Sequence, residues 1–514
     1  MAVPAADVER APNRPDAEAD ADHPDLKGHV ADEGYELFGE ANAETFSEEE
    51  SNAVRRKMDL YLLPLMCGLY GLNYVDKVAM GWAVLFEFRE DLGLKGTEYS
   101  WASSMFYFGY LIAQYPANYI LQRYNTVKVL SISCMAWGCL MIAHLGLKNF
   151  GGLMAIRFLL GVAESVVTPG FVMYTSMFYT RREQVMRTML WACTQGIFSI
   201  IASLLSYGLG HITNTALRPW MYIFLVLGIL SVMVGAGWLF IMPSTPNTAK
   251  FLTHREQVIA VQRVASNMMG IKNYQWKSYQ MWHAAKDPKT WLILAFVLFT
   301  QLPNGGLTNF GSLVVQGLGF DRFGTLLIGM PSSVVSSGSM IVWGFFSLKY
   351  GNLRTWGMII PLIPAIAGIA TVYGTMNTDA NKYGRVVAYW LINSYAVTWP
   401  FTLTIIGQNV AGHTKRASTN AMMLIIFAAG NIAGPFFFRQ GDAPRYVLAI
   451  ATILVCFCAG LICAAALRWY MNWENKRRDR VYGSMETAGD MMDGMRLGMH
   501  DKTDLENPDF RYVL

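Results

Sequence analysis

Charged residues are scarce in this 514-residue chain: Asp, Glu, Lys and Arg together make up 15% of it, against 53% hydrophobic residues. A soluble globular domain carries about a quarter charged residues. The scarcity is greatest between residues 58 and 470, where too few charges remain to cover the surface of a large soluble protein. This absence argues against a soluble multidomain enzyme and favours a chain that lies in lipid.

Cysteine is also sparse, and its placement excludes a disulfide framework. All seven cysteines fall in apolar stretches, where a free thiol behaves as a small hydrophobic side chain. Cys456, Cys458 and Cys463 are closely spaced, but residues two apart do not share a helix face. We therefore expect no metal site and no cofactor. The apolar stretches also lack a Ser-His-Asp set, so we do not expect an enzyme.

The chain does contain many apolar segments of about 20 residues, the length that crosses a bilayer as an α-helix. We predict twelve spans, at 58–78, 98–121, 127–147, 151–176, 187–210, 218–241, 289–315, 324–348, 354–375, 385–408, 416–438 and 445–470. The expected fold class is an all-α membrane protein. Its twelve transmembrane helices are expected to form two pseudo-symmetric six-helix bundles.

Polar stretches divide the chain into five parts. The first 50 residues hold 15 of the 37 acidic groups and 3 of the 41 basic ones, without apolar periodicity, which is typical of disorder. The predicted parts are a disordered acidic tail (1–57), an N-terminal six-helix bundle (58–241), a linker loop (242–288), a C-terminal six-helix bundle (289–470) and a C-terminal tail (471–514).

Basic residues indicate how the chain is oriented. They gather before the first span, within the 242–288 loop and after the last span. Because Lys and Arg are enriched in cytoplasmic loops, we predict that both tails and this loop lie in the cytosol. Inside the loop, Thr253 and Glu256 have the spacing of a capping box, which predicts a short helix.

Two loops, one in each half of the chain, have similar sequences. The sequence Arg123-Tyr124-Asn125-Thr126-Val127-Lys128 follows the second span, and Lys349-Tyr350-Gly351-Asn352-Leu353-Arg354 follows the eighth. Both place a base, a tyrosine and a second base on a tight turn. The similarity of the two loops favours a duplicated bundle.

Ionisable residues are rare inside the predicted spans. Asp76 and Lys77 end the first span, and Arg157 and Glu164 lie in the fourth. Arg157 and Glu164 are two helical turns apart and share a face, whereas Asp76 and Lys77 are adjacent and point apart. Charges in hydrocarbon are costly and face a partner or a cavity. Two interpretations stay open: ion pairs that fix helix packing, or a site that binds an anion and carries a proton.

The second half offers amides in place of charges. Gln301 and Asn304 lie in span seven, and Asn431 lies in span eleven. Leu302-Pro303-Asn304-Gly305-Gly306 predicts a break in span seven, which is tolerated where a helix lines a cavity. Gly430-Asn431-Ile432-Ala433-Gly434-Pro435 predicts either a similar break or close helix packing.

Six strings in the chain resemble the major facilitator superfamily over about residues 55–475. More narrowly, they resemble its anion:cation symporter family, near the allantoate permease group of fungi. The strings are Asn73-Tyr74-Val75-Asp76-Lys77, Arg157-Phe158-Leu159-Leu160-Gly161-Val162-Ala163-Glu164, Ala249-Lys250-Phe251-Leu252, Asp287-Pro288-Lys289-Thr290-Trp291, Asn304-Gly305-Gly306-Leu307-Thr308-Asn309-Phe310 and Asn409-Val410-Ala411-Gly412-His413-Thr414-Lys415-Arg416.

The resemblance implies roles for the residues inside the spans. In such relatives, an Asp-Arg pair in span one and an Arg and a Glu in span four serve anion binding and proton coupling. The implied substrate-binding residues are Arg157, Lys77, Tyr74, Tyr110, Gln195 and Asn431, and the implied proton-coupling residues are Glu164 and Asp76. The resemblance also implies that the bases of the two similar loops act in gating; these are Arg123, Lys128, Lys349 and Arg354. The chain departs from the pattern in that Lys77 replaces the usual Arg, which loses the planar fork that grips a carboxylate.

The expected function is therefore secondary active transport by alternating access. The expected cargo is a small organic anion, such as a ureide, a vitamin or another carboxylic acid, moved in symport with protons. Two alternatives stay open, an exporter of a secondary metabolite on the same fold and a nutrient sensor that does not transport. We expect a monomer in the plasma membrane, with the anion, protons and the lipid bilayer as partners and no nucleic acid.

Overall fold

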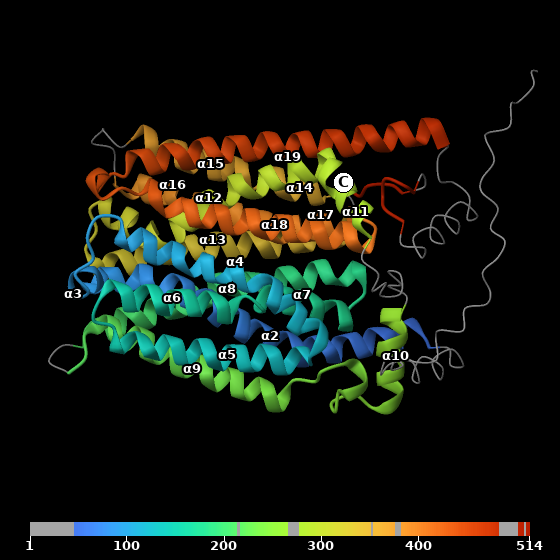
Figure 1. Ribbon diagram of the computed structural model, residues 1–514, viewed down its shortest axis with the longest axis horizontal. Coiled ribbons are helices and arrows are strands. Elements are labelled where there is room, and N and C mark those ends of the chain that lie inside the picture. Colours follow the sequence, from blue (N-terminus) through green and yellow to red (C-terminus); the bar gives the residue numbers. More distant parts are fainter. Residues whose placement is uncertain are drawn as a thin grey trace, which may run out of the picture.

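The computed structural model describes residues 46–212, 216–265, 277–350, 353–375, 382–482, 502–507 and 510–514. These residues form helices and short connections, with no β-strand among them. The long helices run side by side along the molecule, and the start of α2 and the C-terminus lie at the same end (Figure 1). We call this the tail end. The all-α fold class is confirmed.

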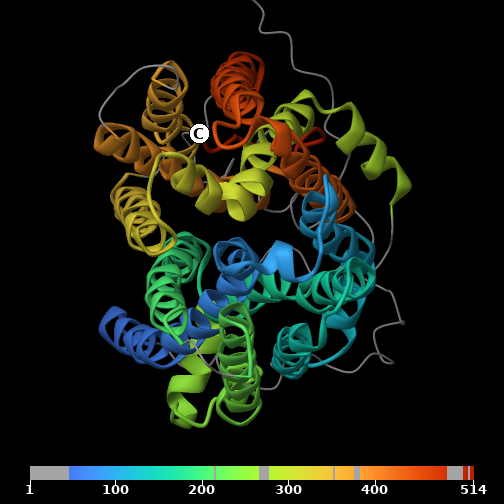
Figure 2. The same cartoon turned by 90° about the vertical axis from the view of Figure 1, so that its left-hand side faces the viewer.

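The described helices traverse the molecule twelve times. The first six traverses are α2 (Glu48–Ala83), α4 (Glu98–Arg123), α5 (Thr126–Ala143), α6 with α7 (Phe150–Glu164 and Val167–Phe178), α8 (Arg181–Leu209) and α9 (Pro219–Ile241). The second six are α12 (Pro288–Gly317), α13 (Arg322–Lys349), α14 with α15 (Arg354–Ile359 and Leu362–Gly374), α16 with α17 (Lys382–Ile392 and Thr398–Asn409), α18 (His413–Ala433) and α19 (Val447–Tyr482). Seen end-on, the two sets form two bundles on opposite sides (Figure 2).

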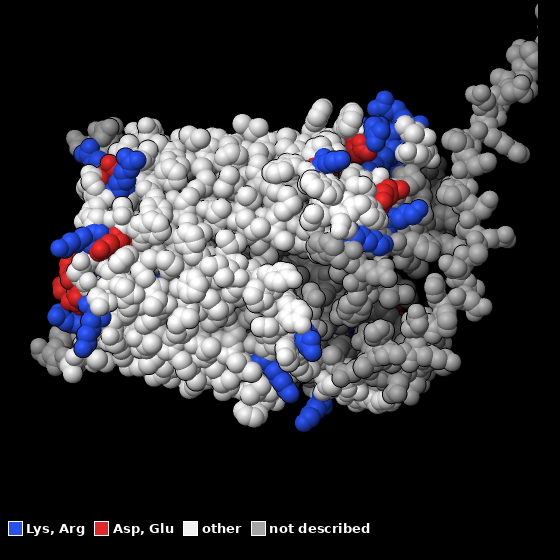
Figure 3. All heavy atoms as spheres, in the orientation of Figure 1, with Lys and Arg blue, Asp and Glu red and all other residues white. Residues whose placement is uncertain are grey.

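The surface between the two ends of the molecule is apolar. On the face in Figure 3, Lys, Arg, Asp and Glu gather toward both ends and leave a broad white band between them. Among the described residues, nine helices or helix pairs are long and apolar enough to cross a membrane. The remaining traverses are α2, α4 and the α16–α17 pair, which contain more polar residues or a 3-10 turn. The chain is an integral, multi-pass membrane protein.

Capping residues move some boundaries away from the predicted ones. Helix α2 begins at Glu48, because Ser47 and Glu50 form a capping box around its first turn, so the prediction of disorder up to residue 57 is wrong there. Residues 1–45 lie outside the described part. The predicted loop helix is confirmed as α10 (His254–Ala265), whose Thr253 amide donates to Glu256 Oε2 at 2.7 Å.

The predicted break in span seven is wrong, since α12 continues through Pro303 as one helix. Gly305 instead lets α12 approach α18, because a Cβ there would lie 2.5 Å from the backbone oxygen of Asn431. Gly434 makes the reciprocal contact with the Leu302 carbonyl. The close-packing interpretation of the glycines in span eleven is therefore confirmed.

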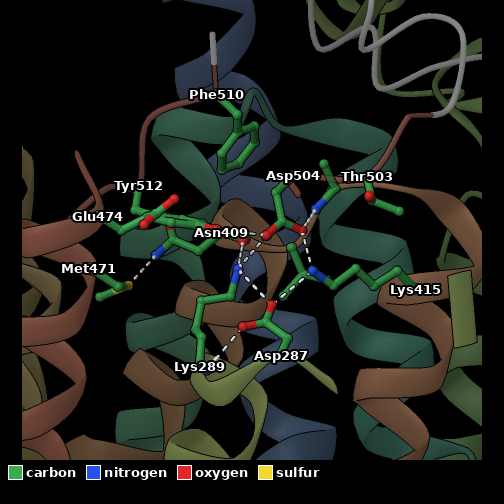
Figure 4. A network of polar contacts seen from close by, with 12 residues as sticks. Asp287, Lys289, Asn409, Lys415, Met471, Glu474, Thr503, Asp504, Phe510 and Tyr512 are labelled. Atoms are coloured by element: carbon green, nitrogen blue, oxygen red, sulfur yellow. Dashed lines mark hydrogen bonds and ion pairs between the residues drawn. The ribbon is translucent and has the colours of Figure 1, made fainter. Parts of the chain in front are cut away.

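The end of the chain folds back onto the tail end of the second bundle (Figure 4). The fully buried carboxylate of Asp504 accepts from Lys289 Nζ at 2.7 Å and Lys415 Nζ at 2.9 Å. It also accepts from the amide of Ala411 at 3.1 Å and the hydroxyl of Tyr512 at 3.0 Å. Helix α19 (Val447–Tyr482) continues past residue 470, where the last span was predicted to end.

Further contacts surround the Asp504 carboxylate and hold the returning chain. Asp287 pairs with Lys415 at 2.8 Å and with Lys289 at 3.5 Å, so two buried lysines face two buried aspartates. The Asn409 amide donates to the Val513 carbonyl at 2.9 Å and accepts from the Val513 amide at 2.7 Å. Lys289 lies in the first turn of α12, Asn409 ends α17 and Lys415 lies in α18, so the chain end joins three helices of one bundle.

Candidate substrate site

A cavity of about 210 Å³ lies between the two bundles. It is smaller than the roughly 300–1,000 Å³ of pockets for drug-sized ligands, which fits a small solute. Of the predicted substrate-binding residues, four line it: Tyr74, Lys77, Tyr110 and Gln195. The cavity is therefore the candidate binding site.

Lys77 is the cation at the wall of this cavity. Its ammonium lies 3.2 Å from Glu164 Oε2 and donates to Asn73 Oδ1 at 2.9 Å. The Asn73 amide in turn donates to the same Glu164 oxygen at 2.7 Å. The Lys77 side chain is 23% exposed, whereas that of Glu164 is fully buried. The Lys77 ammonium thus reaches the cavity, whereas the Glu164 carboxylate lies behind the cavity wall.

Asp76 points away from Lys77, as the helix geometry predicts. Its side chain is fully buried and accepts from Ser231 of α9, at 3.4 Å. Its other oxygen has no hydrogen-bond partner within the described part of the chain. Asp76 therefore lies inside the first bundle rather than in the cavity lining.

Arg157 also lies inside the first bundle. It shares the buried face of α6 with Glu164, as predicted, but it does not line the cavity. Its Nε and Nη2 atoms are buried without a hydrogen-bond partner among the described residues. Glu164 is instead paired with Lys77, on another helix, which sequence spacing alone did not reveal. The role of Arg157 as a substrate ligand stays a prediction.

Asn431 lies next to the cavity lining. It is fully buried and donates to Gln301 Oε1 at 3.1 Å and accepts from the Asn304 amide at 2.8 Å. Gln301 and Asn304 both line the cavity. The second-half amides noted in the sequence therefore form one connected wall.

The predicted gating bases lie at the tail end, outside the cavity lining. The Arg123 guanidinium donates to the Tyr119 hydroxyl at 3.0 Å, and Lys128 is exposed. Lys349 is exposed, and its ammonium lies 5.5 Å from the ring centre of Tyr350. The backbone amide of Arg354 donates to the carbonyl of the last residue at 3.2 Å. Their role in gating stays a prediction.

The bundles meet at the end opposite the tail end. There the Tyr99 hydroxyl donates to the Asn309 carbonyl at 2.9 Å. Ser100 donates to the Pro435 carbonyl at 3.2 Å, and Ser104 donates to that of Ile432 at 2.7 Å. These bonds join α4 to α12 and to the end of α18. This structure is therefore closed at that end.

Sequence reasoning missed part of the second-half wall. Tyr389, Tyr395 and Trp399 line the cavity from α16, the following 3-10 turn and α17. The α13 serines 332, 333 and 336 line it as well. The serines stand in a polar run within an otherwise apolar span, which is a signal that could have identified them. The aromatic residues have no such signal, because aromatic side chains are common throughout these helices.

The model of the Major Facilitator Superfamily matches residues 66–435. The chain belongs to this superfamily. Allantoate permease of Saccharomyces cerevisiae is 32% identical over 496 residues, covering 94% of this chain and 90% of the relative. An uncharacterized transporter of Schizosaccharomyces pombe is 32% identical over 497 residues, or 96% of each chain.

Solved structures agree with the superfamily fold. The proton:xylose symporter XylE bound to 6-bromo-6-deoxy-D-glucose superposes with a TM-score of 0.64 at 12% identity, covering 79% of this chain and 95% of that one. A bacterial homolog of the human lysosomal transporter Spinster, inward-facing and occupied, gives 0.55 at 14% identity over 80% and 96%. Members of this superfamily are transporters, and the expectation that the chain is not an enzyme is confirmed.

Proposed function

We propose that this transporter moves a small organic anion in symport with protons. The observation that supports the proposal most directly is the Lys77–Glu164 ion pair, whose cation reaches the cavity while its carboxylate lies behind the wall. A carboxylate substrate and Glu164 can then compete for the same ammonium. The name of one relative, allantoate permease, also denotes an organic anion.

The competition couples proton binding to substrate binding. When Glu164 takes a proton, it no longer neutralises Lys77, and the ammonium becomes available to a substrate carboxylate. When the proton leaves, the Glu164 carboxylate regains Lys77 and displaces the substrate. Charge-assisted hydrogen bonds contribute about 1.5–3 kcal/mol each, so the exchange changes substrate affinity by roughly tenfold or more. Asn73 keeps Glu164 in place through both steps, since it donates to Glu164 from the same helix as Lys77.

Alternating access supplies the movement. In this structure the bundles are joined by hydrogen bonds at the end opposite the tail end. We infer that the tail end faces the cytosol and that the closed end faces outward in the plasma membrane. Opening requires these bonds to break while α8 and α13, which pack along each other, act as the axis of rocking.

Uptake by the purified protein in proteoliposomes tests the proposal. Labelled carboxylates are screened with the outside made acidic, and accumulation above equilibrium is the expected result. Lys77→Gln should raise the KM roughly tenfold or more, while the exposed Lys148→Gln should behave as wild type. Equal uptake with and without a proton gradient would contradict the coupling, and accumulation only in the outward direction would favour an exporter.

A further inference from the structure

A chain of hydrogen bonds runs through the second-half wall of the cavity. Asn431 Nδ2 donates to the Phe427 carbonyl at 2.8 Å and to Gln301 Oε1 at 3.1 Å. Asn304 Nδ2 donates to Asn431 Oδ1 at 2.8 Å, and the Tyr395 hydroxyl donates to Asn304 Oδ1 at 3.0 Å. The carboxamide of Asn431 therefore uses both of its N–H groups and its oxygen within the protein.

One backbone atom determines the direction of every bond in this chain. The Phe427 carbonyl can only accept, so the Asn431 atom beside it must be the nitrogen. Asn431 Oδ1 then faces Asn304, which must donate. On its other side Asn431 donates, so Gln301 must turn its oxygen toward it. The orientation of each amide follows from the hydrogen bonds rather than from an arbitrary choice of oxygen and nitrogen.

The consequence is that Gln301 offers donors to the cavity. Its oxygen is engaged by Asn431, and its Nε2 has no hydrogen-bond partner in the part of the chain that the structure describes. Lys77, on the first-half wall, is a donor as well. A substrate that spans the cavity must therefore present an acceptor oxygen at each end.

We propose that Asn431 is a positioning residue that holds Gln301 as a donor, so that the substrate is a carboxylate carrying a second carbonyl or carboxylate oxygen. This rests on the proposed function and deepens it. Asn431 does not touch the substrate; it acts through Gln301. A carboxylate whose distal part is hydrocarbon leaves the Gln301 amide without a partner on the substrate, and such a mismatch lowers affinity.

Two probes that differ in one oxygen test the donor. 4-Oxopentanoate has a carboxylate and a ketone, and pentanoate has the carboxylate alone. Each is measured by competition against uptake of a carboxylate that the proteoliposome screen identifies. Wild type should prefer 4-oxopentanoate by about fivefold, the value of one net hydrogen bond. Gln301→Met should reduce that preference to about one.

The role of Asn431 is tested by a double-mutant cycle. Asn431→Leu should also lower the preference, to a value between those of wild type and Gln301→Met, because Gln301 is then free to turn either end toward the cavity. Asn431→Leu with Gln301→Met should lower it no further than Gln301→Met does. A merely structural role would weaken competition by both probes equally and leave their ratio unchanged.

Three results would overturn the inference. They are a wild type that does not distinguish the probes, an Asn431→Leu variant that keeps the full preference, and losses that multiply in the double variant. Multiplied losses would mean that Asn431 touches the substrate directly. A wild type that takes up carboxylates without distinguishing the probes would leave the proposed function in place. Failure to take up any carboxylate would overturn both.

Discussion

Replacing Asp504 with asparagine tests how much the returning chain end contributes to stability. The change keeps the size of the side chain and removes its charge, leaving Lys289 and Lys415 buried with Asp287 as their counter-ion. Removing one partner from a buried ion pair costs about 3–5 kcal/mol. The chain end can detach and let water reach the lysines, which limits the loss of stability. We therefore expect the free energy of unfolding to fall by about 3 kcal/mol and the Tm to fall by several degrees.

A matched control is available on the surface. Asp479 pairs with Arg511 at 2.7 Å, and its side chain is 47% exposed, so Asp479→Asn should cost about 0–1 kcal/mol. Adding Lys415→Met to Asp504→Asn should recover part of the loss, because one lysine then faces one aspartate. The measurement is the Tm of the purified protein in detergent. A Tm for Asp504→Asn no lower than that of the control would refute the reasoning.

The pKa of Asp504 determines how the difference in Tm between wild type and Asp504→Asn depends on pH. Burial alone would raise the pKa of the Asp504 carboxyl, but the charges of Lys289 and Lys415 outweigh it and hold that pKa below its usual range. The stabilisation is therefore complete above the unfolded pKa of about 3.9 and is lost only as pH falls through the lower folded pKa. The Tm difference between wild type and Asp504→Asn should stay constant between about pH 6 and about pH 8.

Three further substitutions and one labelling experiment probe the rest of the molecule. Glu164→Gln, which mimics the protonated acid, should still exchange labelled substrate across the membrane but should fail to concentrate it in a proton gradient; accumulation at the wild-type level would rule Glu164 out as the coupling residue. Arg157→Lys should lose most uptake while the protein still reaches the membrane, and an unchanged apparent affinity would show that Arg157 is structural. Gly161→Ala should destabilise the first bundle by about 1–3 kcal/mol, measured as Tm, because a Cβ at Gly161 overlaps the Phe106 carbonyl; a Tm equal to that of wild type would show that α4 and α6 can separate without cost. Tags at either terminus or in the 242–288 loop should be inaccessible from outside intact cells, and labelling of any of them would overturn the orientation.

The candidate site was only partly predictable from sequence. That Asp76 and Lys77 diverge follows from helix geometry, because neighbouring residues point about 100° apart. The partner of Glu164 did not follow, since it depends on which face of α2 meets α6. The sequence spacing emphasised Arg157, the residue on the same helix, whereas the ion pair is formed with Lys77 from another one.

The sequence by itself determined the properties that depend on a single segment of the chain. The length and apolarity of the spans predict the all-α membrane fold, and the capping residues Thr253 and Glu256 predict α10. These follow from local chemistry: hydrocarbon thickness determines the length of a span, and unsatisfied helix ends require caps.

Only the tertiary structure decided which charged residues of distant segments pair with one another and which helices pack closely. Lys289 appears in the sequence as one more base at the edge of the 242–288 loop, yet it is fully buried against Asp504, 215 positions away. Likewise, Pro303 and Gly305 suggested a broken helix, but α18 packs so closely against α12 that the glycine provides room for contact. Burial of a charge and close approach of two helices are properties of a pair, so neither partner's own sequence contains them.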